Sequence, residues 1–469
     1  MINSEYEKLI NSKRHLAQDF GIKPIWYPDN IYEGNHYKLL DHQRYTADYA
    51  IRKGRCANFL DTGLGKTIVN LVIAYNYAMA TKKRVLIITP LAVAFQFIDE
   101  AQKFGIDDIK YSKDGKLESK IVICNYERLH LFNHSDFETV ILDESSILKN
   151  DKGKIRIAVT AFLRKIKYRF MFTATPSPND FFELGTSSEA LGYLDYSEML
   201  KQFFTNNEKV IKAKNIHDKF MLMPHAKKSF FEWVSTWSIS MRKPSDFGFS
   251  DEGYILPELI TKVHKVKNNQ NWIIDGQIML FNPQARRMGE VREEQRQTVK
   301  ERCEEAVRVA ANHECSVYWT NINKEADLIN ELDKNSYQIN GTMDLDEKED
   351  ILYNFAKGNI KKLITKPRIS SFGLNWQHCN HSVTFPTFSY EQRYQTIRRL
   401  YRFGQKRKVY DDLVTSYGQD VVIKALEAKE KKANELFTEL NSSINENFKA
   451  KKVSEFDKEI KLPSFLRRN

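Results

Sequence analysis

Residues 61–67 have the composition of a phosphate-binding loop. Gly63 and Gly65 can turn their backbone N–H groups toward an anion. Lys66 offers a positive charge to the β and γ phosphates of a nucleotide, and Thr67 offers a hydroxyl to Mg²⁺ at the start of a helix. Phosphate binding is therefore the first chemistry that this sequence predicts.

The residues around this loop favour the same interpretation. Residues 56–60 are an apolar run typical of a strand, and an amphipathic helical pattern starts at Ile68. Thr62 and Leu64 complete the loop, and Leu60 stands where the strict G-x-x-x-x-G-K-[ST] pattern has its first glycine. The alternative is a glycine-rich turn that contains Lys-Thr by chance, but it leaves the strand before the loop and the helix after it unexplained.

Two adjacent carboxylates, Asp143 and Glu144, follow a second apolar run at residues 139–142. A nucleotide-hydrolysing site needs two acidic roles. Asp143 can hold Mg²⁺, mainly through its water shell, and Glu144 can orient and deprotonate the attacking water. By itself the pair also fits a helix cap; the glycine loop earlier in the chain favours the hydrolytic site.

Two arginines near the C-terminal end form a third candidate group. On a helix, Gln395, Arg399 and Arg402 share one face. Arginines that reach a transferring phosphoryl group accelerate transfer by about 10³ to 10⁵. A solvent-exposed basic face is the alternative for this segment taken alone. The opposite face would carry Tyr394, Ile397 and Tyr401.

Two blocks of alternating strand and helix patterns would position these groups. Such alternation is typical of a parallel sheet covered by helices, an α/β fold in which ligands bind at the carboxyl ends of the strands. The strands expected in the first block are residues 56–60, 85–88, 121–124, 139–142 and 169–172. Those in the second block are residues 317–319, 337–339, 362–365 and 382–385, with helices at 324–332 and 344–356.

Between the blocks, residues 181–311 read as helices and loops rich in aromatic residues and lysines. This mixture fits either a helical brace with an aromatic core or a basic surface that stacks unpaired bases. Helical spacing resumes after Asp420 and predicts a terminal helix on the second block. The aromatic residues are Phe203, Phe204, Phe230, Phe231, Trp233 and Trp237, and the nearby cations include Lys209, Lys212, Lys214, Lys227, Lys228, Arg242 and Lys243.

Composition is consistent with a globular protein of several domains. The 469 residues are 42% hydrophobic and carry a net charge of +11, which suits a polyanionic partner without requiring one. The N-terminus lacks the apolar core of a secretory signal and no apolar run reaches the length of a membrane span, so we expect a cytoplasmic protein without membrane contact. Five cysteines without a C-x-x-C pair predict reduced thiols.

Taken in order, these segments resemble the motors of helicase superfamily 2 and, within them, the Swi/Snf-like ATPases of the compact kind found in phages and prophages. The resemblance extends over residues 38–415. Its motifs are His42-Gln43, residues 61–67, Thr89-Pro90-Leu91, Asn125-Tyr126-Glu127-Arg128-Leu129, Asp143-Glu144-Ser145-Ser146, Thr173-Ala174-Thr175-Pro176, residues 370–377 and residues 395–405.

The resemblance implies two tandem RecA-like lobes with a helical insertion between them, and ATP and Mg²⁺ as cofactors. It adds Gln43 as the adenine-reading residue and Gly373 and Asn375 as nucleotide-binding residues of the second lobe. It also implies contacts of Thr89, Leu91 and Ser371 with a nucleic-acid backbone. Motif II departs from the family pattern, because Ser146 replaces the histidine that links this motif to motif III, so coupling is less firmly expected than hydrolysis.

We therefore expect an ATP-dependent motor that translocates on duplex or branched DNA with little sequence preference, in phage-type replication or recombination. A strand-separating helicase, an ATP-regulated scaffold that recruits a nuclease or a replication partner, and RNA as the track are the alternatives. We expect a monomer, located in the host cytoplasm if a phage encodes it. The expected divisions are an extension (1–35), lobe 1 (36–180), a helical insertion with linker (181–265), lobe 2 (266–425), and a C-terminal helix and tail (426–469).

Overall fold

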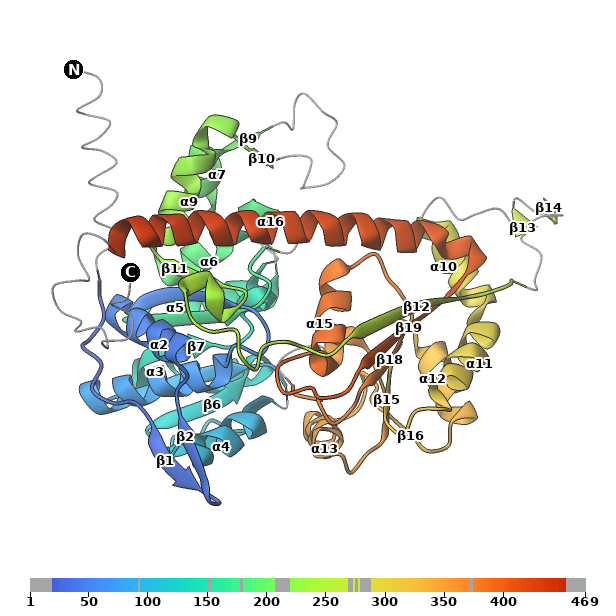
Figure 1. The fold of residues 1–469 in the computed structure, drawn as a ribbon, viewed down its shortest axis with the longest axis horizontal. Helices are drawn as coiled ribbons and strands as arrows, with labels where there is room; N and C mark the ends of the chain where they lie inside the picture. The colour runs from blue at the N-terminus through green and yellow to red at the C-terminus, as the bar shows by residue number, and fades with distance from the viewer. Residues whose placement is uncertain are drawn as a thin grey trace.

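Figure 1 shows the fold, two α/β lobes side by side beneath one long helix. The computed structural model describes residues 19–91, 93–149, 153–177, 180–206, 220–268, 273–274, 277–278, 288–370 and 374–452. The first 18 residues, most of the lysine-rich segment around Lys212, and the last 17 residues lie outside this range.

Lobe 1 is built on a seven-stranded parallel sheet with the order β11-β3-β8-β7-β4-β6-β5. All five strands predicted for this block are present, because their apolar runs are buried on both faces of the sheet. Two further strands were not predicted, β5 and β11, which are short and lie at the two edges. The strands are β3 (Arg55–Leu60), β4 (Arg84–Thr89), β5 (Ile109–Tyr111), β6 (Ile121–Asn125), β7 (Phe137–Leu142), β8 (Tyr168–Thr173) and β11 (Ser238–Met241).

Helices cover both faces of this sheet (Figure 1). They are α2 (Asp41–Lys53), α3 (Lys66–Thr81), α4 (Val93–Lys103) and α5 (Lys154–Leu163). A hairpin of β1 (Asp29–Tyr32) and β2 (Asn35–Lys38) precedes them. The segment before the hairpin is fixed to α3, because the Asn76 side chain accepts hydrogen bonds from the backbone N–H groups of Ile25 (2.8 Å) and Trp26 (3.0 Å).

Lobe 2 has a six-stranded parallel sheet with the order β12-β19-β18-β15-β17-β16. The two parallel sheets confirm the predicted fold class. The strands are β12 (Leu259–Val266), β15 (Ser316–Trp319), β16 (Ser336–Gln338), β17 (Lys362–Thr365), β18 (His381–Thr384) and β19 (Val409–Ser416). The helices are α10 (Met288–Gln297), α11 (Val299–Ala310), α12 (Asn323–Leu332), α13 (Leu345–Ala356), α14 (Pro367–Ser370) and α15 (Tyr390–Leu400).

The segment after β8 forms a helical subdomain on lobe 1. Phe203, Phe204, Phe230 and Trp237 are at most 5% exposed, so these rings form a core and are not available to stack bases. Burial favours the brace interpretation of these aromatic residues; Lys209, Lys212 and Lys214 lie outside the described residues. The elements of the helical subdomain are α6 (Leu184–Leu191), α7 (Tyr196–Phe203), β9 (Phe204–Asn206), β10 (Phe220–Leu222) and α9 (Lys227–Ser235). Separately, a small hairpin of β13 (Ile273–Ile274) and β14 (Gln277–Ile278) follows β12.

The C-terminal helix α16 (Asp420–Lys452) crosses from lobe 2 to lobe 1, and Figure 1 shows it spanning the top of both. Val422 and Leu426 pack on lobe 2, whereas Leu440 and Ile444 belong to a hydrophobic cluster of lobe 1. The predicted terminal helix on lobe 2 is present, but its second contact, with lobe 1, was not predicted, because helical spacing identifies an apolar stripe but not the surface that covers it. Among the described residues, no helix combines the length and the apolar character that a bilayer crossing needs.

Candidate active site

A cavity of about 330 Å³ lies between the carboxyl ends of the lobe 1 strands β3 and β7 and the lobe 2 segments that precede β18 and β19. Its size is that of a small-molecule site. The glycine loop and the acidic pair line it from lobe 1, and the two arginines line it from lobe 2. The predicted residues among its walls are Gln43, Thr62, Gly63, Gly65, Lys66, Thr67, Asp143, Glu144, Asn375, Arg399 and Arg402.

The glycine loop joins β3 to α3 in a conformation that needs glycine. Gly65 has a φ of +83°, and a Cβ atom there would lie 2.2 Å from Nε2 of Gln43. Lys66 begins α3, and its Nζ donates to the backbone oxygens of Leu60 (3.1 Å) and Asp61 (3.3 Å). Burial lowers the pKa of Lys66, although Glu144 and Asp143 oppose this shift. The loop therefore presents a half-buried cation and open backbone N–H groups to the cavity.

The acidic pair follows β7 directly. Burial raises the pKa of Asp143 to about 7, and the neighbouring Glu144 adds to this shift while Lys66 and the two arginines oppose it. Asn70 Nδ2 donates to Asp143 Oδ1 (3.3 Å). Glu144 has a φ of +55°, a left-handed conformation that is uncommon outside glycine and that occurs at functional sites.

A chain of hydrogen bonds connects Glu144 to the arginines of lobe 2. Thr173 Oγ1 donates to Glu144 Oε1 (2.9 Å), and the backbone N–H of Thr175 donates to Thr173 Oγ1 (3.0 Å). Gln395 Nε2 then donates to Thr175 Oγ1 (3.2 Å), and Arg399 Nη2 donates to Gln395 Oε1 (2.9 Å). The chain therefore joins motif II to motif III and motif III to lobe 2.

The same chain of hydrogen bonds shows which residues make the link that the absent motif II histidine would make. Ser146 Oγ donates to Glu144 Oε1 (2.9 Å), the same oxygen that Thr173 contacts. Ser146 therefore holds the Glu144 carboxylate, and Glu144 itself makes the link to motif III.

The two arginines reach the cavity from α15 and from the turn that follows it. The predicted helical face is correct for Arg399, but α15 ends at Leu400, so Arg402 reaches the cavity from the turn. Both guanidinium groups donate to the backbone oxygen of Leu374, from Arg399 Nη1 at 3.0 Å and from Arg402 Nη1 at 3.4 Å. Burial lowers the pKa of Arg399 to about 10 and that of Arg402 to about 9.

Two polar atoms on the lobe 2 wall, one donor and one acceptor, fit a polar ligand. Arg402 Nε and Asn375 Oδ1 are buried, and neither has a hydrogen-bond partner among the described residues. Buried polar atoms of this kind are costly unless a ligand or water satisfies them. With Lys66, Arg402 Nε is suited to a triphosphate, whereas Asn375 Oδ1 accepts hydrogen bonds and is suited to a donor group of the ligand. Asp143 and Thr67 are the oxygen donors that would hold Mg²⁺.

Some predicted residues lie elsewhere or outside the described range. Leu64 is buried in the core of lobe 1 and does not line the cavity. Thr89 is fully buried and its Oγ1 donates to Cys124 O (3.4 Å), while Leu91 is 9% exposed. Gly373 and Ser371 lie outside the described residues. The contacts predicted for Thr89, Leu91 and Ser371 with nucleic acid remain predictions.

Several wall residues carried no signal in the sequence. Lys38, Leu40 and Phe104 line the cavity, and Gln96 Nε2 donates to Thr67 Oγ1 (3.4 Å). Phe403 of lobe 2 packs so closely that a Cβ atom on Gly63 would lie 2.7 Å from its Cβ. The position of Phe403 within the arginine motif was the one available signal.

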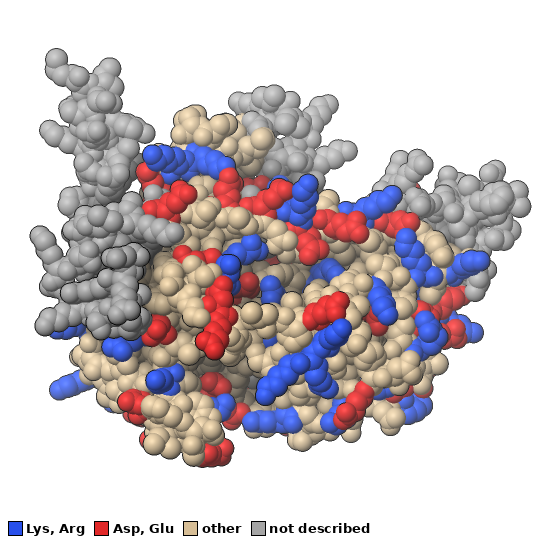
Figure 2. Space-filling view, in the orientation of Figure 1, with Lys and Arg blue, Asp and Glu red and all other residues tan. Residues whose placement is uncertain are grey.

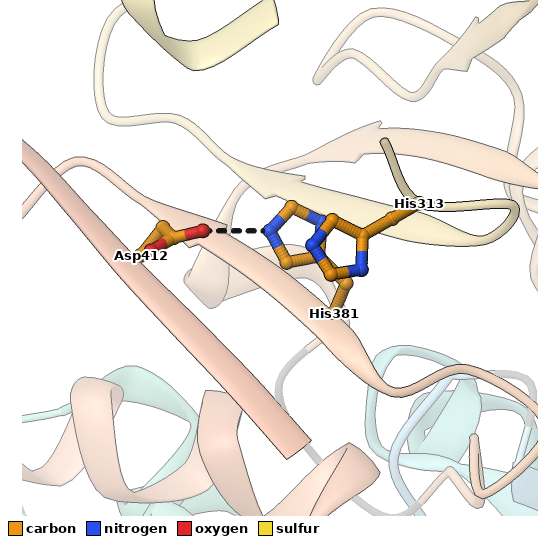
Figure 3. Close-up of side chains that lie close together, drawn as sticks. All are labelled: His313, His381 and Asp412. Atoms are coloured by element: carbon orange, nitrogen blue, oxygen red, sulfur yellow. Dashed lines mark hydrogen bonds and ion pairs between the residues drawn. The ribbon is translucent and has the colours of Figure 1, made fainter. Parts of the chain in front are cut away.

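A second polar cluster in lobe 2 joins the loop before β15, the first residue of β18 and the middle of β19 (Figure 3). His313 stacks on His381 with ring centroids 3.7 Å apart and planes inclined by 8°. His381 Nε2 bonds to Asp412 Oδ2 (2.9 Å) and its Nδ1 bonds to Ser316 Oγ (2.8 Å). Parallel rings cannot both direct a nitrogen lone pair at one cation, so this cluster is a structural network and not a metal centre.

Comparison with known proteins finds two helicase domain families in this chain. A model of the DEAD/DEAH box helicase family matches residues 41–183, and a model of the helicase conserved C-terminal domain matches residues 297–404. The matched ranges together cover more than half of the chain and include both walls of the cavity.

Curated relatives match a shorter part of the chain. DNA annealing helicase and endonuclease ZRANB3 from Bos taurus is 28% identical over 172 residues, which cover 33% of this chain and 16% of that relative. SWI/SNF-related matrix-associated actin-dependent regulator of chromatin subfamily A-like protein 1 from Xenopus tropicalis is 28% identical over 164 residues, 33% of this chain and 17% of that relative. The match therefore spans about a sixth of the length of these relatives.

Solved structures agree on the fold. S. cerevisiae Dbp5 bound to RNA and ADP BeF3 has a TM-score of 0.55 at 12% identity, with coverage of 87% of this chain and 94% of that chain. At this identity the likeness concerns the fold alone. On the family matches, the chain belongs to the ATP-hydrolysing helicases of superfamily 2, and its sequence relatives place it beside the Swi/Snf-like ATPases of that superfamily.

Proposed function

We propose that this enzyme is an ATP-driven motor that translocates on duplex or branched DNA without sequence preference, as a monomer in the cytoplasm, and that it belongs to the compact type encoded by phages and prophages. Replication or recombination of phage DNA is the process in which we place it. The observation that carries the proposal is a cavity whose walls come from both lobes and hold the glycine loop, the acidic pair and the two arginines.

A site divided between two bodies makes hydrolysis depend on closure. ATP would bind to Lys66 and Thr67 of lobe 1, and Arg399 and Arg402 complete the site only when lobe 2 is docked. Because nucleotide then stabilises the closed arrangement over the open one, binding and product release alternate the two arrangements. Glu144 is the residue that we propose to orient and deprotonate the attacking water, and Mg²⁺ on Asp143 and Thr67 would neutralise phosphate charge.

A groove on lobe 2 that carries exposed basic side chains supports a polyanionic track. A cavity of about 560 Å³ lies at the carboxyl ends of β15, β17 and β18, and its lining includes Thr320, Asn321, Lys366, Arg292 and Arg368. Both arginines are exposed there. Arg368 precedes the predicted backbone contact Ser371 by three positions in the sequence. Phosphate contacts of this kind position a nucleic acid without reading its sequence.

Charge elsewhere is less informative. On the face drawn in Figure 2, basic and acidic side chains are interspersed, so the net charge of +11 does not gather on that face. The names of the sequence relatives support DNA, since ZRANB3 is called a DNA annealing helicase. Dbp5 is described with RNA, so RNA is kept as an arm of the test.

The experiment measures ATP turnover of the full chain without nucleic acid and with single-stranded DNA, duplex DNA, forked DNA and RNA. We expect the largest stimulation with duplex or forked DNA, and loss of turnover in Lys66→Ala without loss of folding. Strand displacement on the same substrates distinguishes translocation from unwinding. Equal turnover with and without DNA would reject the motor. Stimulation by RNA alone would show that the motor acts on RNA and not on DNA.

The scaffold alternative makes a different prediction for the same preparation. An ATP-regulated scaffold that recruits a nuclease or a replication partner binds DNA in response to ATP and does not depend on turnover. Triplex displacement from duplex DNA reports translocation directly. Displacement by the wild type and none by Lys66→Ala supports the motor; DNA binding without displacement supports the scaffold.

A further inference from the structure

Two side chains of lobe 2 contact the glycine loop of lobe 1 from outside the ATP cavity. Tyr394 Oη donates to Asp61 Oδ1 (2.5 Å), and Arg398 Nη2 lies 3.6 Å from Asp61 Oδ2. Both carboxylate oxygens of Asp61 therefore interact with α15. None of these three residues lines the cavity, and no role for them follows from the motifs.

Asp61 is well placed to transmit this contact to the loop. Its Oδ1 accepts the backbone N–H of Thr62 (2.6 Å), and its backbone oxygen accepts from Lys66 Nζ (3.3 Å). Burial alone would raise the pKa of Asp61, but Arg398 and the hydrogen bonds from Tyr394 and Thr62 outweigh it, so the pKa is lowered and the carboxylate stays charged. The side chain thus ties the start of the loop to lobe 2.

The spacing on α15 relates this contact to the arginine in the cavity. Tyr394 and Arg398 are four residues apart on the helix, and the pair Gln395 and Arg399 follows one position later. The two pairs form neighbouring ridges of one helix surface. Holding the first ridge on Asp61 fixes the rotation of α15, and this rotation aims Arg399 into the cavity.

We propose that Tyr394 and Arg398 are positioning residues for ATP hydrolysis, which act through Asp61 to set α15 against the glycine loop when the lobes close. They do not touch the nucleotide. Their removal leaves the lobe 1 contacts with ATP and the closure of the lobes intact. Among the closed molecules, it lowers the fraction in which Arg399 is correctly aimed. The effect therefore falls on kcat and not on KM for ATP.

The test compares kcat and KM for ATP in the full chain at saturating duplex DNA and also without nucleic acid. The variants are Arg398→Gln, Tyr394→Phe, Asp61→Asn and the double variant Asp61→Asn with Arg398→Gln. Asn at position 61 keeps an oxygen for the Thr62 N–H and removes only the charge. Tyr390→Phe is the matched control, because it removes a tyrosine hydroxyl from the same helix without altering the contact with Asp61.

We expect each single variant to lower kcat about tenfold with KM changed less than about threefold, and the double variant to be no worse than either single one, because coupled residues are not additive. Arg398→Lys should recover most of kcat, and Tyr390→Phe should match the wild type. Melting curves confirm that each variant is folded.

Three results would overturn the proposal. They are a kcat within twofold of the wild type in both Arg398→Gln and Tyr394→Phe, a rise in KM at constant kcat, and losses that multiply in the double variant. If Arg398→Gln does not fold, the comparison of Arg398→Lys with Asp61→Asn decides, since a positioning contact requires a small loss in the first and a large loss in the second.

Discussion

The two lobes meet in two zones that differ in chemistry. In the first zone, α15 meets the glycine loop and the acidic pair, and the groups involved line the ATP cavity or contact residues that do. In the second zone, α13 meets the β5–β6 edge of lobe 1. There Glu349 of lobe 2 is fully buried and accepts from Tyr111 Oη (2.5 Å) and Asn125 Nδ2 (2.9 Å), with Arg128 Nη1 at 3.4 Å and Lys113 Nζ at 3.2 Å.

None of the residues of the second zone lines the cavity. This zone contributes to docking of the lobes without touching the reacting groups, whereas the first zone contributes to docking and to chemistry. Closure and hydrolysis should therefore respond separately to mutation. Because each zone has a buried glutamate, the same substitution can be made in both.

The largest effect is expected for Glu144→Gln in the first zone. The amide cannot accept the proton of the attacking water, and loss of a general base costs about 10² to 10⁴ in rate. Turnover should fall by that factor, while ATP binding measured by titration changes little. Glu118→Gln at an exposed ion pair with Lys110 is the control. Turnover of Glu144→Gln within threefold of the wild type would show that Glu144 is not the general base.

A smaller effect is expected for Glu349→Gln in the second zone. Breaking a buried ion pair on one side costs about 3 to 5 kcal/mol. The cost is smaller here, because Arg128 and Lys113 keep Asp346 as a counter-charge. The lobes should open more readily, so that the apparent KM for ATP rises severalfold while kcat stays within about threefold, and the amides near Tyr111 exchange faster with deuterium. A loss of kcat comparable to that of Glu144→Gln would show that the zones are not separate.

The smallest effect concerns stability. The pKa of Asp143 rises from 3.8 to about 7 on folding. The folded state therefore binds more protons between these values, and stability falls as the pH rises through this window and stays reduced above pH 7. Asp143→Asn removes this penalty. We expect the nucleotide-free variant to melt a few degrees higher than the wild type at pH 8, and the difference to disappear near pH 4.

Melting curves of the two proteins at several pH values, without Mg²⁺, check this expectation. The variant should also lose ATP turnover, since an amide is a poor substitute for a carboxylate near Mg²⁺. An unchanged or lower melting temperature at pH 8 would contradict the burial cost that we attribute to Asp143.

Local sequence patterns predicted most strands and helices of the fold. They also predicted the glycine loop and the acidic pair of the site, but not the contacts between the lobes. The β-branched runs of β4, β6 and β7 are buried on both faces, so each reads as a strand in isolation. The edge strand β11 alternates Ser238, Ile239, Ser240 and Met241, and β5 has three residues, so neither stood out. The loop and the acidic pair could be placed because each follows a predicted strand directly.

Contacts between lobes could not be predicted, because no local pattern encodes them. Glu349 lies on an ordinary amphipathic helix, and only the folded chain brings it to Asn125, 224 residues earlier. Tyr394 was expected on a face of α15 opposite the arginines, yet it reaches Asp61 of the other lobe. Such pairs depend on how two separately folded bodies dock, and that geometry follows from the whole surface of each.

The most direct test of the two-lobed site is ATP turnover and ATP binding of Arg399→Gln, measured beside Arg407→Gln as a control arginine of lobe 2. A site completed by lobe 2 predicts that Arg399→Gln retains ATP binding while turnover falls by about 10³ or more, and that the control behaves as the wild type. Turnover of Arg399→Gln within threefold of the wild type would show that lobe 1 hydrolyses ATP without the second lobe.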